Sequence, residues 1–176
     1  LAVIHDTLVQ GGYRVRIATS GLGALESARR MPPDLILLDA AMPGMDGFDT
    51  CLRLKELLET RHIPVVFMTG LTDTDHVVRG FQAGGVDYVT KPIRPLEVLA
   101  RIESHLRNSR QMADTLRAAD AAGDAIVAVD AQQRMQWATP LAQSRLRPLL
   151  DGDGQLPQVL RRWLAGPSAE PSFTLV

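Results

Sequence analysis

The sequence contains a single cysteine, Cys51, in 176 residues. One thiol excludes a framework of intramolecular disulfides and fits a reducing compartment. Acidic and basic residues nearly balance, and the net charge is −1. The protein therefore has no overall electrostatic field that would attract nucleic acid or an acidic membrane. No apolar run is long enough to cross a bilayer, and no signal peptide is recognisable. We therefore expect a cytoplasmic protein without membrane attachment.

The residues that are present predict a globular α/β protein. Hydrophobic residues make up 45% of the chain and charged residues 22%, which is enough apolar surface for a core in one large or two small domains. Residues 35–38 form an apolar run that is too short for a buried helix and is followed by a Pro-Gly turn. Such a run indicates a strand buried on both faces, as in a parallel sheet. Asp39 follows at the carboxyl end of this strand, where open α/β sheets bind their ligands.

Two later strands are predicted to bring further polar groups to the same edge. Residues 65–68 lead into Thr69, and residues 86–90 lead into Lys91. Thirty residues separate Asp39 from Thr69 and 22 separate Thr69 from Lys91, so each interval has room for one crossover helix. Right-handed crossovers place a carboxylate, a hydroxyl and an ammonium group on one side of the sheet. A carboxylate in that position can bind a divalent cation or act as a nucleophile.

Asp39, Thr69, Tyr88 and the Lys91-Pro92 pair, at these spacings, resemble the receiver domain of two-component response regulators. The resemblance covers roughly residues 1–107. It implies a doubly wound, flavodoxin-like fold with a five-stranded parallel sheet. By resemblance, the protein accepts a phosphoryl group from a sensor histidine kinase and is a switch rather than a metabolic enzyme. Its only chemistry would be self-catalysed phosphotransfer and dephosphorylation.

The resemblance also implies a role for each site residue. Asp39 is the phosphoryl acceptor, and it binds Mg²⁺ together with the backbone carbonyl of Ala41 and an acid from outside these 176 residues. Lys91 pairs with Asp39 at rest and with the phosphoryl group afterwards, and its bond to Pro92 is cis. Thr69 moves to the phosphoryl group, and Tyr88 swings into the space that Thr69 leaves.

One part of the receiver pattern is missing from the sequence. A receiver opens with an apolar strand and two or three acidic residues, whereas this sequence begins within the next helix, over residues 1–10. The missing strand belongs in the middle of the sheet, next to a strand that we predict at residues 13–18. Its loss would remove hydrogen bonds from two neighbours, so we expect that the natural polypeptide is longer at its N-terminus.

The last receiver helix is predicted to continue into a second region. Leu99, Ile102, Leu106, Ser109, Ala113 and Leu116 follow the spacing of a heptad seam. Two interpretations stay open: the first half packs on the sheet and the rest is a solvated linker, or the helix pairs with a second copy.

Residues 123–176 contain a predicted hairpin, 124–130 and 134–138, and then a helix capped by Thr139. A helix at 158–164 and a strand at 172–176 follow. This order loosely resembles the opening of a PAS-like domain, in which Trp137 and Trp163 line a ligand pocket or, more simply, pack in a core.

We therefore divide the chain into a receiver domain (1–107), a linker or signalling helix (108–122) and a small α+β PAS-like segment (123–176). The leading hypothesis is a homodimeric response regulator that controls transcription through a LuxR-type DNA-binding domain outside these residues. The same front end also suits a cyclic-dinucleotide synthase or a hybrid histidine kinase. A pseudo-receiver that binds proteins without phosphorylation is a further alternative. A flavin-binding flavodoxin is disfavoured because no phosphate-binding loop follows the first strand and helix.

Overall fold

The computed structural model describes residues 2–57, 59–70, 74–129, 135–146 and 158. The chain forms two compact units, Leu1–Met112 and Ala113–Val176, which are described separately. The first unit contains a parallel sheet in the order β1-β2-β3. Its strands are β1 (Ile36–Asp39), β2 (Val65–Thr69) and β3 (Asp87–Thr90). Its helices are α1 (Ala2–Gln10), α2 (Gly21–Arg30), α3 (Gly47–Glu56), α4 (Thr74–Gln82) and the start of α5 (Pro95–Ala121).

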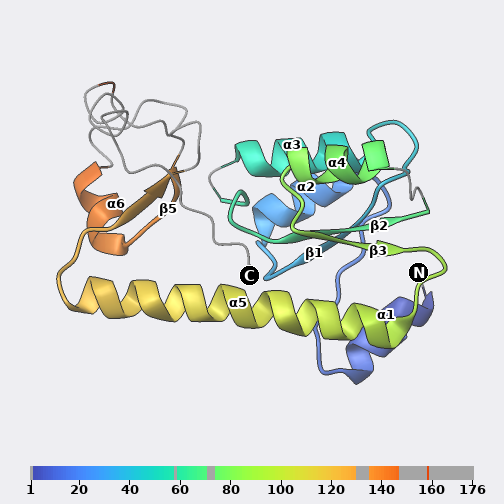
Figure 1. Ribbon diagram of the computed structural model, residues 1–176, viewed down its shortest axis with the longest axis horizontal. Coiled ribbons are helices and arrows are strands. Elements are labelled where there is room, and N and C mark those ends of the chain that lie inside the picture. The colour runs from blue at the N-terminus through green and yellow to red at the C-terminus, as the bar shows by residue number, and fades with distance from the viewer. Residues whose placement is uncertain (1, 58, 71–73, 130–134, 147–157, 159–176) are drawn as a thin grey trace, which may run out of the picture. The chain divides into compact units, whose positions relative to one another are not determined.

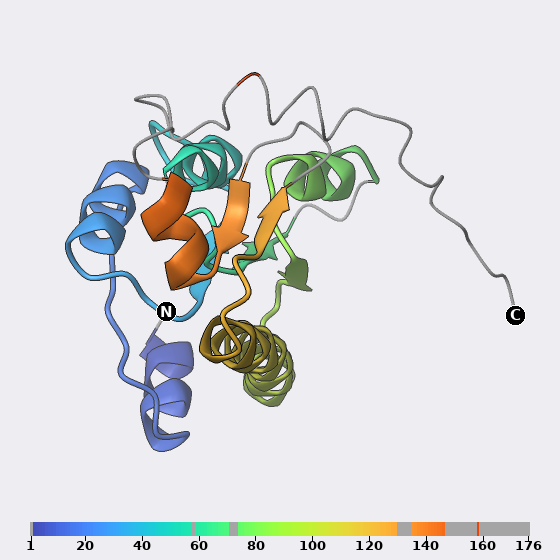
Figure 2. The ribbon, with the colours of Figure 1, turned by 90° about the vertical axis from the view of Figure 1, so that its left-hand side faces the viewer.

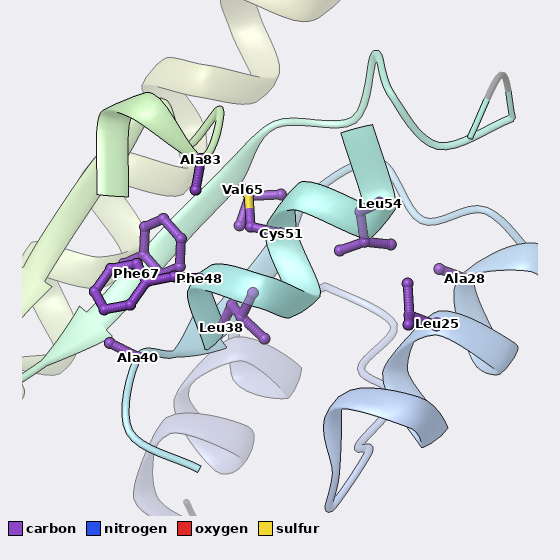
Figure 3. Packing of buried hydrophobic residues seen from close by; sticks show 10 residues of the cluster. All are labelled: Leu25, Ala28, Leu38, Ala40, Phe48, Cys51, Leu54, Val65, Phe67 and Ala83. Carbon is purple, nitrogen blue, oxygen red and sulfur yellow. The ribbon is translucent and has the colours of Figure 1, made fainter. Parts of the chain in front are cut away.

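The sheet is covered on both faces, because successive residues of a strand point to opposite sides. Val65 and Phe67 of β2 pack in a cluster with residues of α2 and α3, which Figure 3 shows from close by. Val66, between them, packs in a second cluster with Leu8 of α1 and Ile102 of α5. Figures 1 and 2 show the resulting layers, with α2, α3 and α4 on one face and α1 and the start of α5 on the other. The fold is therefore a doubly wound, flavodoxin-like α/β fold.

Local sequence signals set the helix ends. Ser20 caps α2 by accepting a hydrogen bond from the Gly23 amide, and Asp46 caps α3 through the Asp49 amide. Pro95 is the first residue of α5, where its missing amide proton costs nothing. Gly84, with a φ of 91°, ends α4 in the left-handed conformation that glycine adopts without strain.

The sheet differs from the five strands that were predicted. Within the described residues it has three strands, and residues 13–18 form no strand. The prediction for 13–18 was wrong because an extended segment becomes a strand only beside a hydrogen-bonding partner. In the flavodoxin-like order that partner is the first strand, which these 176 residues do not include. Arg16 instead ties the segment to α2 by donating hydrogen bonds to the carbonyls of Ser27 and Met31.

Helix α5 is 27 residues long and extends beyond the receiver, as the seam predicted. Ile102 and Leu106 are buried against the sheet, so the first half of the seam packs within the first unit. Ser109 and Met112 are exposed, which leaves this stretch of the helix in solvent. The structure therefore agrees with the first interpretation for residues 99–106. It does not test pairing beyond them.

The second unit contains the end of α5, an antiparallel hairpin and a short helix. The hairpin pairs β4 (Val127–Val129) with β5 (Met135–Ala138), and α6 (Pro140–Leu146) follows. Thr139 is fully buried, and its hydroxyl caps α6 through the Ala142 amide, as predicted. Trp137 is half-buried in β5. Of the predicted helix at 158–164 only residue 158 is described, and Trp163 and the predicted strand at 172–176 lie outside the described residues.

No helix in the described part of the chain is both long enough and apolar enough to span a membrane.

Candidate functional site

The strand register brings the predicted polar residues to one edge of the sheet. Asp39 ends β1 opposite Met68, and Thr69 ends β2 opposite Thr90. The Lys91 amide donates a hydrogen bond of 2.8 Å to the Thr69 carbonyl, so the residue after β3 is fixed beside the end of β2. The peptide bond between Lys91 and Pro92 is cis. Asp39, Thr69 and Lys91 therefore share the carboxyl edge.

The carboxylate of Asp39 and the ammonium group of Lys91 form an ion pair at this edge. Lys91 Nζ lies 2.7 Å from Asp39 Oδ2, and the Ala41 amide lies 3.1 Å from Asp39 Oδ1. The Lys91 and Asp39 side chains are 41% and 32% exposed, respectively, so a solvent-borne reactant can reach the pair. A carboxylate held between an ammonium group and an amide is oriented and accessible. Such a group can act as a nucleophile or bind a cation.

Thr69 and Tyr88 line a common cleft beside this pair. Thr69 is buried, with 6% of its surface exposed, whereas Tyr88 is 37% exposed. The ring of Tyr88 meets that of Phe81 edge to face, with centroids 6.2 Å apart. The rest of the cleft wall comes mostly from α3, α4 and β2. These residues are Phe48, Phe67, His76, Val77, Gly80, Phe81, Gly85 and Asp87.

The first turn of α3 lies directly against the strand that ends in Asp39. The Gly47 amide donates a hydrogen bond of 3.0 Å to the Ala40 carbonyl. A Cβ atom at Gly47 would lie 2.2 Å from the Asp39 carbonyl oxygen, so only glycine fits at this distance. The sequence analysis did not single out Gly47. The Asp-Gly pair was the available signal, yet the close approach depends on the packing of α3 on β1.

Oxygen donors at the edge fit part of a magnesium shell. By resemblance, the ligands would be the Asp39 carboxylate and the Ala41 backbone carbonyl, which are ligand types that Mg²⁺ prefers, and this ion keeps several waters when bound. Within the described residues, no group of three or more His, Cys, Asp or Glu side chains is arranged to hold a metal ion. The structure does not test Asp39 and the Ala41 carbonyl as magnesium ligands, and this assignment stays a prediction.

A second ionic network fixes β3 to α5. Asp87 accepts hydrogen bonds from both Arg101 and His105 of α5, and Arg101 also contacts Glu97. Burial raises the pKa of the Asp87 carboxyl group, but the hydrogen bonds from His105, the Tyr88 amide and Arg101 outweigh it and hold the pKa below the usual value. The network therefore stabilises the fold while Asp87 is ionised.

We predict that Asp87 contributes stability at neutral pH that is lost in acid. A carboxyl group whose pKa is lowered by folding contributes fully above its unfolded pKa, and the contribution disappears as the pH falls through the folded value. Asp87→Asn should lower the free energy of unfolding at pH 7 by about 1–3 kcal/mol. Urea unfolding between pH 7 and pH 3 measures the difference.

The difference in the free energy of unfolding between wild type and Asp87→Asn should shrink as the pH falls below the ordinary pKa of an aspartate, which is about 3.9. Asp114→Asn is the matched control, because its carboxylate is 72% exposed and pairs with Arg117 on the surface. We expect that change to matter little. A constant difference across the pH range would show that Asp87 acts through packing and not through its charge.

Cys51 is a buried core residue. It is fully buried in α3, and burial raises the pKa of its thiol to about 11, with a smaller opposing effect from Lys55. A thiol with so high a pKa is protonated at neutral pH and is a poor nucleophile.

The sheet order, the layers and the Asp39–Lys91 pair define a flavodoxin-like α/β domain with an acidic site at its carboxyl edge. The chain belongs to the response regulator receiver domain family, whose sequence pattern matches residues 1–103. It is therefore the receiver domain of a two-component response regulator, followed by a C-terminal extension of uncertain identity.

Two curated relatives agree with this assignment. The chain is 44% identical over 111 residues to Response regulator PleD of Caulobacter vibrioides, covering 63% of this chain and 24% of PleD. It is 39% identical over 122 residues to DNA-binding response regulator MtrA of Mycobacterium tuberculosis, covering 68% of this chain and 52% of MtrA. The chain thus spans only about a quarter to a half of these relatives.

A solved structure agrees with the fold. The receiver domain of sensor histidine kinase PA1611 from Pseudomonas aeruginosa, with magnesium ion coordinated in its active site cleft, is 28% identical to this chain with a TM-score of 0.56. The similarity covers 60% of this chain and 86% of that one.

Proposed function

We propose that this domain accepts a phosphoryl group on Asp39 from a sensor histidine kinase and changes conformation in response. The observation that carries the proposal is the 2.7 Å ion pair between Lys91 Nζ and Asp39 Oδ2 at an exposed sheet edge. It supports the proposal because it orients a carboxylate and supplies a fixed cation for incoming phosphoryl oxygens.

The transfer is a substitution at phosphorus. A carboxylate oxygen of Asp39 forms the new P–O bond as the P–N bond of the phosphohistidine breaks. The imidazole nitrogen keeps the electron pair and takes up a proton. Lys91 leaves the carboxylate and pairs with a phosphoryl oxygen, so its charge stays compensated. Asp39 and the Ala41 carbonyl would hold Mg²⁺, which neutralises negative charge on the phosphoryl group when bound.

Thr69 and Tyr88 form the proposed readout. The Thr69 hydroxyl donates a hydrogen bond to the phosphoryl group, and the Tyr88 ring enters the cleft that both residues line. A hydrogen bond to a charged group contributes about 1.5–3 kcal/mol, enough to make a minor conformation dominant. The protein is thus proposed to be a switch and not a metabolic enzyme.

The proposal extends to the output. We propose control of transcription through a DNA-binding domain outside these residues, because MtrA, a DNA-binding response regulator, is 39% identical to this chain. The hairpin of β4 and β5 followed by α6 supports a PAS-like segment. The exposed stretch of α5 around Met112 supports pairing with a second copy as a homodimer.

Incubation with acetyl phosphate tests the central step. With Mg²⁺ present, the intact mass of the chain should rise by one phosphoryl group, and hydroxylamine should remove it because it cleaves acyl phosphates. Chelation of the metal should prevent the gain. No gain with Mg²⁺, or a gain that resists hydroxylamine, would contradict phosphorylation on a carboxylate and favour the pseudo-receiver alternative.

A further inference from the structure

The cleft beside Thr69 is narrow and partly open to solvent. Its accessible volume is about 10 Å³, roughly the space needed for one water molecule. His76, Val77, Gly80 and Phe81 of α4 form one wall. The position of α4 therefore sets the room available to Tyr88, because the strands β2 and β3 are fixed by their ladder.

Helix α4 lies close to the core at this wall. A Cβ atom at Gly80 would lie 3.3 Å from Phe67 Cδ2 and 3.5 Å from Phe48 Cε1, so the helix approaches both rings closely. His76, one turn earlier in α4, stacks on the Phe48 ring with centroids 6.4 Å apart. Whatever holds α4 in this position also keeps the cleft narrow.

Arg79 connects α4 to the first turn of α3. Its Nη2 lies 3.0 Å from Asp46 Oδ2 and 3.4 Å from Asp49 Oδ1, and its Cζ lies 4.6 Å from the centroid of the Phe48 ring. Asp46 uses its other carboxylate oxygen to cap α3. One guanidinium group therefore contacts two carboxylates and an aromatic face on the neighbouring helix.

The first turn of α3 is a firm anchor for this contact. Gly47 is hydrogen-bonded to the Ala40 carbonyl and leaves no space between α3 and the end of β1. Phe48 is 4% exposed and packs on Phe67 with centroids 5.1 Å apart. Because α3 is fixed in this way, the contacts of Arg79 restrain α4 and not α3.

We propose that Arg79 is a positioning residue that holds α4 in the resting state and thereby sets how readily Tyr88 enters the cleft. The inference rests on the proposed phosphoryl switch and adds a restraint to it. The contacts of Arg79 compete with the entry of Tyr88, so phosphorylation has to overcome them. Loss of Arg79 makes the switch easier to turn on.

Three variants isolate this restraint. Arg79→Gln removes the charge and the planar group, and Arg79→Lys keeps the charge but loses the flat surface over Phe48. Asp49→Asn removes one partner and leaves the cap at Asp46 intact. Arg53→Gln is the matched control, because Arg53 is an exposed arginine of α3. Each is compared in the full chain, with thermal unfolding as a measure of stability.

Two measurements follow the switch. The first is the initial rate of phosphoryl uptake from acetyl phosphate, measured by intact mass. Arg79→Gln should raise it on the order of threefold to tenfold, given the usual strength of exposed ion pairs and cation–π contacts. The second is the ¹⁹F spectrum of protein labelled with 3-fluorotyrosine. Tyr13 and Tyr88 are the two tyrosines, so the signal that remains in Tyr13→Phe belongs to Tyr88.

We expect the Tyr88 signal of unphosphorylated Arg79→Gln to shift part of the way towards that of the phosphorylated wild type. Asp49→Asn and Arg79→Lys should show smaller changes in the same direction, and Arg53→Gln none. A merely structural arginine would lower stability without raising the uptake rate. If the wild type takes up a phosphoryl group but Arg79→Gln shows neither a faster uptake nor a ¹⁹F shift, the proposed role of Arg79 is wrong while the proposed function stands. No uptake by wild type would overturn the proposed function instead.

Discussion

Replacing Asp39 by asparagine is expected to reduce phosphoryl uptake to the background of the donor alone. An amide lacks the negative charge that attacks phosphorus and cannot form an acyl phosphate, so the rate should fall on the order of 10³-fold or more. Intact-mass analysis after incubation with acetyl phosphate and Mg²⁺ measures the loss. The effect should be this large because the amide also loses its ion pair with Lys91, which lies 2.7 Å away in the wild type.

Asp34→Asn is the matched control for this change. Asp34 is an exposed aspartate just before β1, at the opposite end of the strand from Asp39. Its replacement removes the same charge from the same region but should leave uptake unchanged. Thermal unfolding should show that Asp39→Asn is folded, because an ion pair this exposed contributes little to stability. Full uptake by a folded Asp39→Asn protein would place the acceptor elsewhere.

Among Gly→Ala substitutions at the described glycines, the change at Gly47 is expected to cause the largest loss of stability. The new Cβ would lie 2.2 Å from the Asp39 carbonyl oxygen and 2.8 Å from the Ala40 Cα, both of which are backbone atoms. Because neither atom can rotate away, β1 and α3 must separate. Alanine favours helix by only about 1 kcal/mol, whereas forced repacking costs about 3 kcal/mol or more. Urea unfolding measures the net loss.

The displacement should also lower phosphoryl uptake, since the backbone of Asp39 itself is pushed. Gly23→Ala is the control, because its Cβ would meet no backbone atom of another element; it would lie 3.2 Å from the Ser20 Oγ that caps α2, and this side chain can shift slightly. We expect that variant to be as stable as wild type or slightly more stable. A Gly47→Ala protein with normal stability and normal uptake would show that α3 does not need its close approach to the strand.

The positions along the chain that bear the site were predictable from the sequence. A short apolar run, an acid after it, and a threonine and a lysine after two further runs were enough to place Asp39, Thr69 and Lys91 at one edge. Parallel strands with short crossovers leave no other arrangement. The caps at Ser20 and Asp46 were predictable for a similar reason, since a helix start depends on residues within one turn. The prediction of a strand at 13–18 was wrong because strand formation depends on a hydrogen-bonding partner, and these 176 residues do not include the one that the fold requires.

The sequence by itself determined the order of elements, the edge that bears the site and the family, because these follow from local patterns and fixed chain connectivity. Only the tertiary structure decided that Gly47 must touch the Asp39 carbonyl, that the cleft beside Thr69 is narrow, and that Arg79 of α4 reaches Asp46 and Asp49 of α3. These contacts join residues on separate helices. Their distances are set by how side chains fill the space between layers, which no pattern along one segment records.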